Sequence, residues 1–239
     1  MKRISFLIIC FVLYSFFKNV YAQSTQNKIL SIKQESVSDD FLSETEYLIS
    51  KEMIIQVWHR TENKYINLTN IKYTLYDIEN DRFCHIDTEI KNAFCQDSLG
   101  GFRLLESYNY KKPKINALQY LGQPAIEIVS SESTYEPKNP FSNDSYSIKH
   151  IYSSLDIIHR YLDESRFGIL EFFNLKQTHA PHNFEMEIEM KSNRNGSLFK
   201  HRKITSIEEQ AFPKKLFKRI KKAKVQPFEV LRARIRNRK

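Results

Sequence analysis

Alternating apolar and polar residues predict several short β-strands in this chain. The clearest is residues 184–190, FEMEIEM, in which apolar side chains alternate with glutamates. The turn-forming sequence SNRNG follows, and then SLFKHRKI, so this region predicts a β-hairpin. Residues 71–77, IKYTLYD, also have a period of two, and MIIQVWH at 53–59 is typical of a buried strand.

Apolar residues at helical spacing predict the longest helix over residues 148–164, with Ser147 as its N-cap. Shorter helices are expected at the start of residues 41–52, around DTEIKNAF at 87–94, and through Phe212 after a capping box formed by two residues. The apolar positions of the long helix and the capping-box residues are Ile148, Ile151, Tyr152, Leu155, Ile158 and Leu162, and Thr205 and Glu208.

These segments predict an α+β fold with a single domain, a mainly antiparallel sheet and about three helices. The globular domain is expected to span residues 23–213, and a basic amphipathic tail to follow over 214–239. Only 5 glycines occur in the whole chain, which argues against glycine-rich phosphate loops.

The first 22 residues have the layout of a secretory signal peptide. Lys2 and Arg3 precede an apolar run over residues 4–17, and Ala22 ends a small-residue cleavage pattern. A retained membrane anchor is the alternative, but the run is shorter than the roughly 20 residues that a spanning helix needs. We therefore expect export to the periplasm, the outer envelope or the extracellular space.

The positive charge of the chain is concentrated at its C-terminal end. Residues 214–239 contain seven lysines and five arginines against Glu229, a net charge of +11 in a chain whose total is +9. Residues 1–22 carry +3, which leaves −5 for residues 23–213. Such an asymmetry usually concerns partners rather than the fold.

The segment PKKLFKRIKKAK predicts a basic amphipathic helix that begins at Pro213. Lipid headgroups or another polyanion of the cell envelope would attract this tail, with no specific nucleic acid expected; a solvated tail without a fixed partner is the alternative. The residues predicted to bind an anionic surface are Lys214, Lys215, Lys218, Arg219, Lys221, Lys222, Arg232, Arg234, Arg236 and Arg238.

Cys84 and Cys95 are the two cysteines outside the predicted signal peptide. An oxidising compartment favours a disulfide between them. Two buried thiols, or half of a metal site, are the competing interpretations, and the CxxC spacing of common metal sites is missing.

Candidate catalytic residues are few, because the common hydrolase, nucleotide-binding and metalloprotease motifs do not occur in the sequence. His179 and His182 lie three residues apart, close to Glu185, and this trio is the weak candidate for proton transfer or metal binding. An exposed turn in which the histidines have no shared role is the alternative, and it is the one we favour. The glutamates at 185, 187 and 189 are expected to lie on a solvated sheet face. We expect no cofactor and no bound metal.

Two function classes follow from these observations. The first is an exported binding protein of the cell envelope or extracellular space, which binds a protein partner or an anionic surface through its basic tail. The second is an exported hydrolase that uses His179 and His182, so the sequence leaves open whether the protein is an enzyme. A third polar residue converging on these histidines would favour the enzyme.

Cleavage of the signal peptide is expected to leave a secreted form that starts at or near Gln23, because the residue pattern before Gln23 fits a signal-peptidase site. Intact-mass measurement of the exported protein checks this expectation. A mass that includes residues 1–22 would instead support the membrane anchor.

Overall fold

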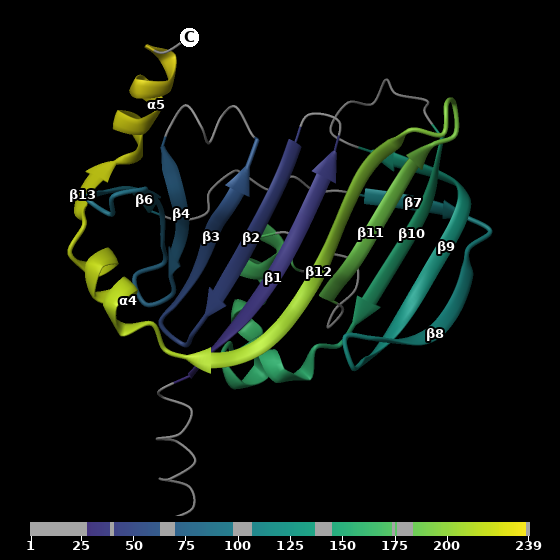
Figure 1. Cartoon of the computed structure of the whole chain (residues 1–239), viewed down its shortest axis with the longest axis horizontal. Coiled ribbons are helices and arrows are strands. Elements are labelled where there is room, and N and C mark those ends of the chain that lie inside the picture. Colours follow the sequence, from purple (N-terminus) through teal and green to yellow (C-terminus); the bar gives the residue numbers. More distant parts are fainter. Residues whose placement is uncertain are drawn as a thin grey trace, which may run out of the picture.

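The computed structural model describes residues 28–38, 41–62, 70–97, 107–136, 145–173, 175 and 184–237. One mixed sheet of thirteen strands dominates them (Figure 1). Its strands are β1 (Lys28–Ser38), β2 (Phe41–Ile49), β3 (Met53–Thr61), β4 (Ile71–Asp77), β5 (Arg82–Asp87), β6 (Asn92–Asp97), β7 (Ser107–Lys111), β8 (Lys114–Tyr120), β9 (Gln123–Glu136), β10 (Ser145–Ser153), β11 (Phe184–Ser192), β12 (Leu198–Ala211) and β13 (Lys224–Pro227).

The strand order is β13-β6-β5-β4-β3-β2-β1-β12-β11-β10-β9-β7, and β8 also pairs with β9. Neighbouring strands are antiparallel except for β13, which runs parallel to β6. The helices are short: η1 (Asp156–Arg160) and η2 (Glu164–Arg166) are 3-10 helices, and α3 (Gly168–Phe172), α4 (Lys214–Lys221) and α5 (Phe228–Arg236) are α-helices.

Adjacent residues of the central strands serve two hydrophobic cores on opposite faces of the sheet. Ile54 belongs to the first core and Ile55 to the second, and Leu30 and Ile29 divide in the same way. Side chains alternate between the two faces of a strand, so a strand that is covered on both faces needs consecutive apolar residues. The run MIIQV of β3 meets this requirement, with each of its five residues buried.

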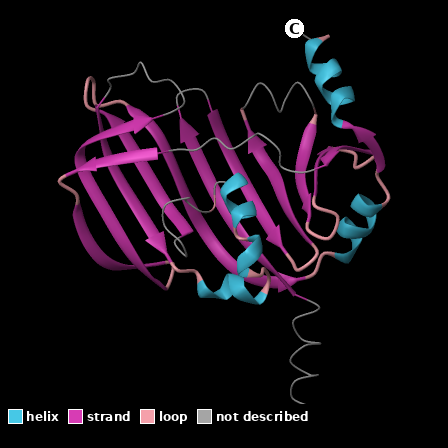
Figure 2. Ribbon diagram, turned by 180° about the vertical axis from the view of Figure 1, so that it is seen from behind, coloured by secondary structure: helices cyan, strands magenta, loops and turns pink. Residues whose placement is uncertain are grey.

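The segment from η1 to α3 covers the first core, and Figure 2 shows it lying across the sheet. Its side chains Leu155, Ile158, Leu162, Phe167 and Leu170 are buried there. Helix α4 covers the second core through Phe217 and Ile220. A third, smaller core lies beneath α5, where Phe228 and Leu231 meet Phe94 of β6.

The C-terminal segment wraps around one edge of the sheet. In β6, Ala93 and Cys95 belong to the core beneath α4, whereas Phe94 between them belongs to the core beneath α5. Helices α4 and α5 therefore lie on opposite faces, and β13 between them pairs with the edge of β6. We call residues 212–237 the C-terminal clasp.

The predicted α+β class is wrong. A large mixed sheet dominates the described residues, and the helices are short covers on its faces. The error has a physical cause: strands buried on both faces lose the period of two that distinguishes a strand from a buried helix in the sequence.

The helix predicted over residues 148–164 is also wrong. Residues 145–153 form β10, which pairs with β9 on one side and β11 on the other. Leu155 then takes a positive φ of 47°, and the backbone turns there between the end of β10 and the start of η1. The short helices expected within 41–52, 87–94 and 205–212 are instead β2, the β5–β6 hairpin and the end of β12.

Several local predictions are confirmed. Residues 53–59 and 71–77 lie in β3 and β4, and β11 and β12 form the predicted hairpin around Gly196, whose φ is 70°. The basic helix after Pro213 is α4. No helix of the described residues is long and apolar enough to cross a membrane. The predicted signal peptide lies outside the described residues and stays a prediction.

The predicted disulfide between Cys84 and Cys95 is present. The two residues are directly opposite each other in the β5–β6 hairpin, with their α-carbons 4.1 Å apart. The bond therefore ties β5 to β6, the strand that pairs with β13.

Replacing both cysteines by serine is expected to lower the free energy of unfolding by about 2–3 kcal/mol, because the unfolded chain regains the entropy of a short open loop. Urea unfolding of the wild type and of Cys84→Ser/Cys95→Ser measures the difference. Reduced wild type serves as the control and should resemble the variant. Equal stability of all three forms would contradict a stabilising bond.

Candidate functional site

Helix α4 presents a basic face because its apolar side chains are held against the sheet. Phe217 and Ile220, three residues apart, are buried in the second core. Residues at this spacing share one face of a helix, so the remaining side chains turn outward. All basic residues of α4 are exposed: Lys214, Lys215, Lys218, Arg219 and Lys221.

A shallow hollow of about 370 Å³ lies beside α4. Its apolar part is formed by Phe212 and Phe217, whose ring centroids are 4.1 Å apart. Four lysines and one glutamate complete the lining: Lys214, Lys218, Lys221, Lys222 and Glu52. We call this site the lysine–phenylalanine hollow; it combines positive charge with aromatic surface.

One of these lysines is neutralised by the domain itself. Lys221 Nζ lies 2.9 Å from Glu52 Oε2, and this hydrogen bond raises the pKa of Lys221. Among the described residues, Lys214, Lys218 and Lys222 have no carboxylate partner. The hollow therefore keeps a local excess of positive charge.

Helix α5 adds arginines that stack on buried rings. The guanidinium of Arg232 lies 5.0 Å from the ring centroid of Phe228, and that of Arg234 lies 4.8 Å from the ring centroid of Phe94. Cation–π contacts of this kind hold an arginine stem in place while its charge stays accessible. Arg236 is exposed, and the predicted residue Arg238 lies outside the described residues.

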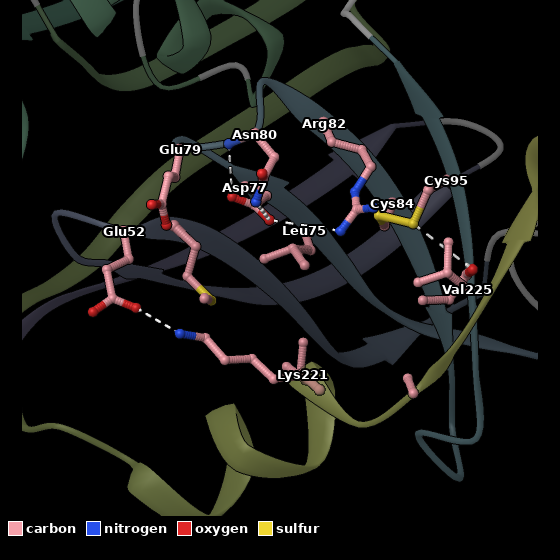
Figure 3. A pocket seen from close by; sticks show the side chains of 14 residues that line it. Glu52, Leu75, Asp77, Glu79, Asn80, Arg82, Cys84, Cys95, Lys221 and Val225 are labelled. Carbon is pink, nitrogen blue, oxygen red and sulfur yellow. Dashed lines mark hydrogen bonds and ion pairs between the residues drawn. A yellow bond between two sulfur atoms is a disulfide. The ribbon is translucent and has the colours of Figure 1, made fainter.

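A second hollow, of about 300 Å³, lies between the clasp and strands β3 to β6 (Figure 3). The disulfide and Val225 line one end of it, and Glu52 and Lys221 line the other. Because this ion pair also lines the lysine–phenylalanine hollow, it separates the two hollows.

Some polar groups of the second hollow bond one another. Asp77 Oδ1 accepts a hydrogen bond of 3.1 Å from the backbone N–H of Asn80, and Arg82 lies 3.7 Å from the same carboxylate. Acidic and basic side chains are mixed there, so this hollow lacks the excess of positive charge of its neighbour.

Glu185 lies in a buried ion pair, away from both hollows. Arg202 Nε donates to its carboxylate at 2.8 Å, and His150 Nε2 lies 3.4 Å from its other oxygen. Burial alone would raise the pKa of Glu185, but the Arg202 guanidinium holds that pKa well below its usual range. The pair cross-links β11 and β12, and His150 extends the contact to β10.

Two tyrosines enclose His150 in the same cluster. The hydroxyl of Tyr152 lies 2.9 Å from His150 Nδ1, and Tyr110 of β7 also contacts this nitrogen. Burial raises the pKa of Tyr110 to about 12 and raises the pKa of Tyr152 above its usual range. These phenols therefore stay neutral at physiological pH. The contact between Tyr110 and His150 joins the edge strand β7 to β10.

Of the three predicted catalytic residues, only Glu185 lies within the described residues. His179 and His182 lie outside the described residues. Glu185 is bonded to Arg202, and it is 2% exposed, so the expected solvated face is wrong at this position. In the described residues no three histidine, cysteine or acidic side chains form a group able to hold a metal.

Sequence reasoning missed Phe212, Glu52 and Val225. An aromatic residue directly before Pro213 and the basic run was the available signal for Phe212. Glu52 had no local signal, because its contact with Lys221 joins residues far apart in the chain. Val225 is 54% exposed, which only the fold reveals.

The sequence matches no protein-family model and no curated protein. Among solved structures, an uncharacterised conserved protein from Thermus thermophilus aligns with 86% of this chain and 93% of its own, at 5% identity and a TM-score of 0.41. A LolA superfamily protein from Nitrosomonas europaea aligns over 80% and 90%, at 8% identity and a TM-score of 0.28. Similarities this low assign neither a family nor a function to the chain.

Low pH is expected to destabilise the packing of α5 on the sheet through His85. The ring of His85 stacks on Phe228 of α5, with the ring centroids 5.6 Å apart. Burial lowers the pKa of His85 to about 4, whereas an unfolded histidine titrates near 6.5. The unfolded chain therefore binds the proton first, and stability that is complete above about pH 6.5 is lost as the pH falls towards 4.

Urea unfolding at pH 7 and pH 4.5 tests this effect. The wild type should lose about 1–3 kcal/mol more than His85→Gln between these two pH values. His159→Gln, at a more exposed histidine, serves as the control and should behave like the wild type. The same pH dependence in wild type and His85→Gln would exclude His85 as the cause.

Proposed function

We propose that this protein is an exported, non-catalytic binding protein that its C-terminal clasp holds at an anionic surface. The observation that carries this proposal is the fixed position of the cationic side chains. Buried Phe217, Ile220, Phe228 and Leu231 anchor the clasp on both faces of the sheet, while its lysines and arginines stay exposed.

A fixed arrangement of charge binds better than a flexible one, because less conformational entropy is lost on contact. Each basic residue near an anionic membrane contributes up to about 1 kcal/mol, so several acting together give measurable affinity. The acidic balance of residues 23–213, net −5, would repel such a surface and turn the clasp towards it.

Export is supported by the predicted signal peptide together with the disulfide, since disulfides persist in oxidising compartments. The hydrolase alternative gains no support from the described residues. Glu185, its proposed carboxylate, already pairs with Arg202, and the buried cluster around it serves to join strands.

Neutralising three lysines of the lysine–phenylalanine hollow should remove most binding to anionic surfaces. Lys214→Gln/Lys218→Gln/Lys222→Gln is expected to weaken binding to phosphatidylglycerol vesicles or heparin by at least about tenfold in dilute buffer, since three charges are lost. Wild-type binding should fade as salt rises, because the attraction decays within roughly 8–10 Å at ordinary ionic strength. Vesicle co-sedimentation and heparin affinity chromatography provide the readouts.

The matched control removes the same charge elsewhere. Lys33, Lys112 and Lys114 are exposed and lie outside the clasp, so replacing them by glutamine should leave binding close to wild type. Equal losses in the two triple variants would show that net charge alone acts. No binding of the wild type at low salt would refute the proposal.

A further inference from the structure

The lysine–phenylalanine hollow offers more than charge. Its lining includes a pair of aromatic rings and the three lysines without a carboxylate partner among the described residues, Lys214, Lys218 and Lys222. Phe217 forms the buried floor, whereas Phe212 is only partly buried and reaches the surface. An ammonium group next to an accessible phenyl ring suits a ligand that is anionic at one end and apolar at the other.

A second apolar residue lies at the far end of α4. Val225 of β13 is 54% exposed and lines the hollow next to the disulfide, on the same side of the sheet as α4 (Figure 3). The basic row of α4 therefore has an accessible apolar side chain near each end, Phe212 before it and Val225 after it.

Building on the proposed function, we propose that the anionic surface is a phospholipid bilayer. The lysines of the hollow engage lipid phosphates, and Phe212 and Val225 enter the apolar part of the interface. A bilayer presents phosphates directly above acyl carbons, and surfaces that combine basic and apolar residues settle about 5–10 Å into this boundary.

A soluble polyanion fits these observations less well. It would satisfy the lysines, but it offers no apolar phase for Phe212 and Val225, which would stay in water. A free phosphate or glycerol phosphate likewise lacks the acyl chains. The two accessible apolar residues thus favour a lipid over the other anions that lysine attracts.

Substitution of the apolar residues tests the inference separately from the charge. Val225→Ser and Phe212→Ser are each expected to weaken binding to vesicles of phosphatidylcholine with phosphatidylglycerol by about tenfold, from the apolar area that no longer leaves water. Heparin binding by the same variants should remain at the wild-type level. Ile115→Ser, at an apolar residue 65% exposed on β8, is the matched control and should bind vesicles normally.

Circular dichroism and thermal unfolding identify any variant that no longer folds. Because Val225 is exposed, its variant keeps the test valid if Phe212→Ser is unstable. Competition by sn-glycerol 1-phosphate separates a bilayer from a free headgroup: an excess of this soluble compound should leave vesicle binding intact.

Three results would overturn the inference while leaving the proposed function standing. Both apolar variants could bind vesicles like the wild type, heparin binding could fall together with vesicle binding in these variants, or glycerol phosphate could displace the vesicles. Absence of binding to every anionic probe would instead refute the proposed function itself.

Discussion

Burial of both faces of one sheet is the constraint on which the rest of this structure depends. A sheet of this width cannot leave either face of its central strands in water, because Ile54 and Ile55 point to opposite sides and both are apolar. The segment from η1 to α3 covers one face. Helix α4 of the C-terminal clasp covers the other face at the end of the sheet where the disulfide lies.

The same packing determines where the charge lies. The clasp carries ten basic residues against Glu229, yet Phe217 and Phe228 make it part of two hydrophobic cores. Its cations are therefore displayed from fixed positions. The buried Glu185–Arg202 pair has the opposite character: its charges neutralise each other inside the sheet and hold strands together.

The sequence was informative where local chemistry decides the structure. The turn at Gly196, the alternation of β4 and β11, the disulfide and the amphipathic α4 each depend on residues close together in the chain. The overall class could not be recognised in this way. In SYSIKHIYS of β10, burial on both faces gave apolar residues a spacing that also fits a helix, and only pairing with β9 and β11 decides between the two.

The sequence predicted the basic residues of the candidate site, but it did not predict the hollow that they line. Basic residues at helical spacing indicated an amphipathic helix, but they did not show which apolar side chains would be buried and which accessible. Phe217 and Phe212 are equally apolar in the sequence, and packing on the sheet alone distinguishes them. The contact between Glu52 and Lys221 likewise exists only in the folded chain.

The parallel pairing of β13 with β6 also concerns the solubility of the protein. An open strand edge exposes backbone groups that can pair with another copy, and natural sheets protect such edges with lysine, proline and short strands. β13 has all three features: it spans four residues, begins at Lys224 and ends at Pro227, which has no backbone N–H to donate. The charges around it repel a second copy of the same chain. The same segment therefore forms the last strand at this edge of the sheet and discourages self-association.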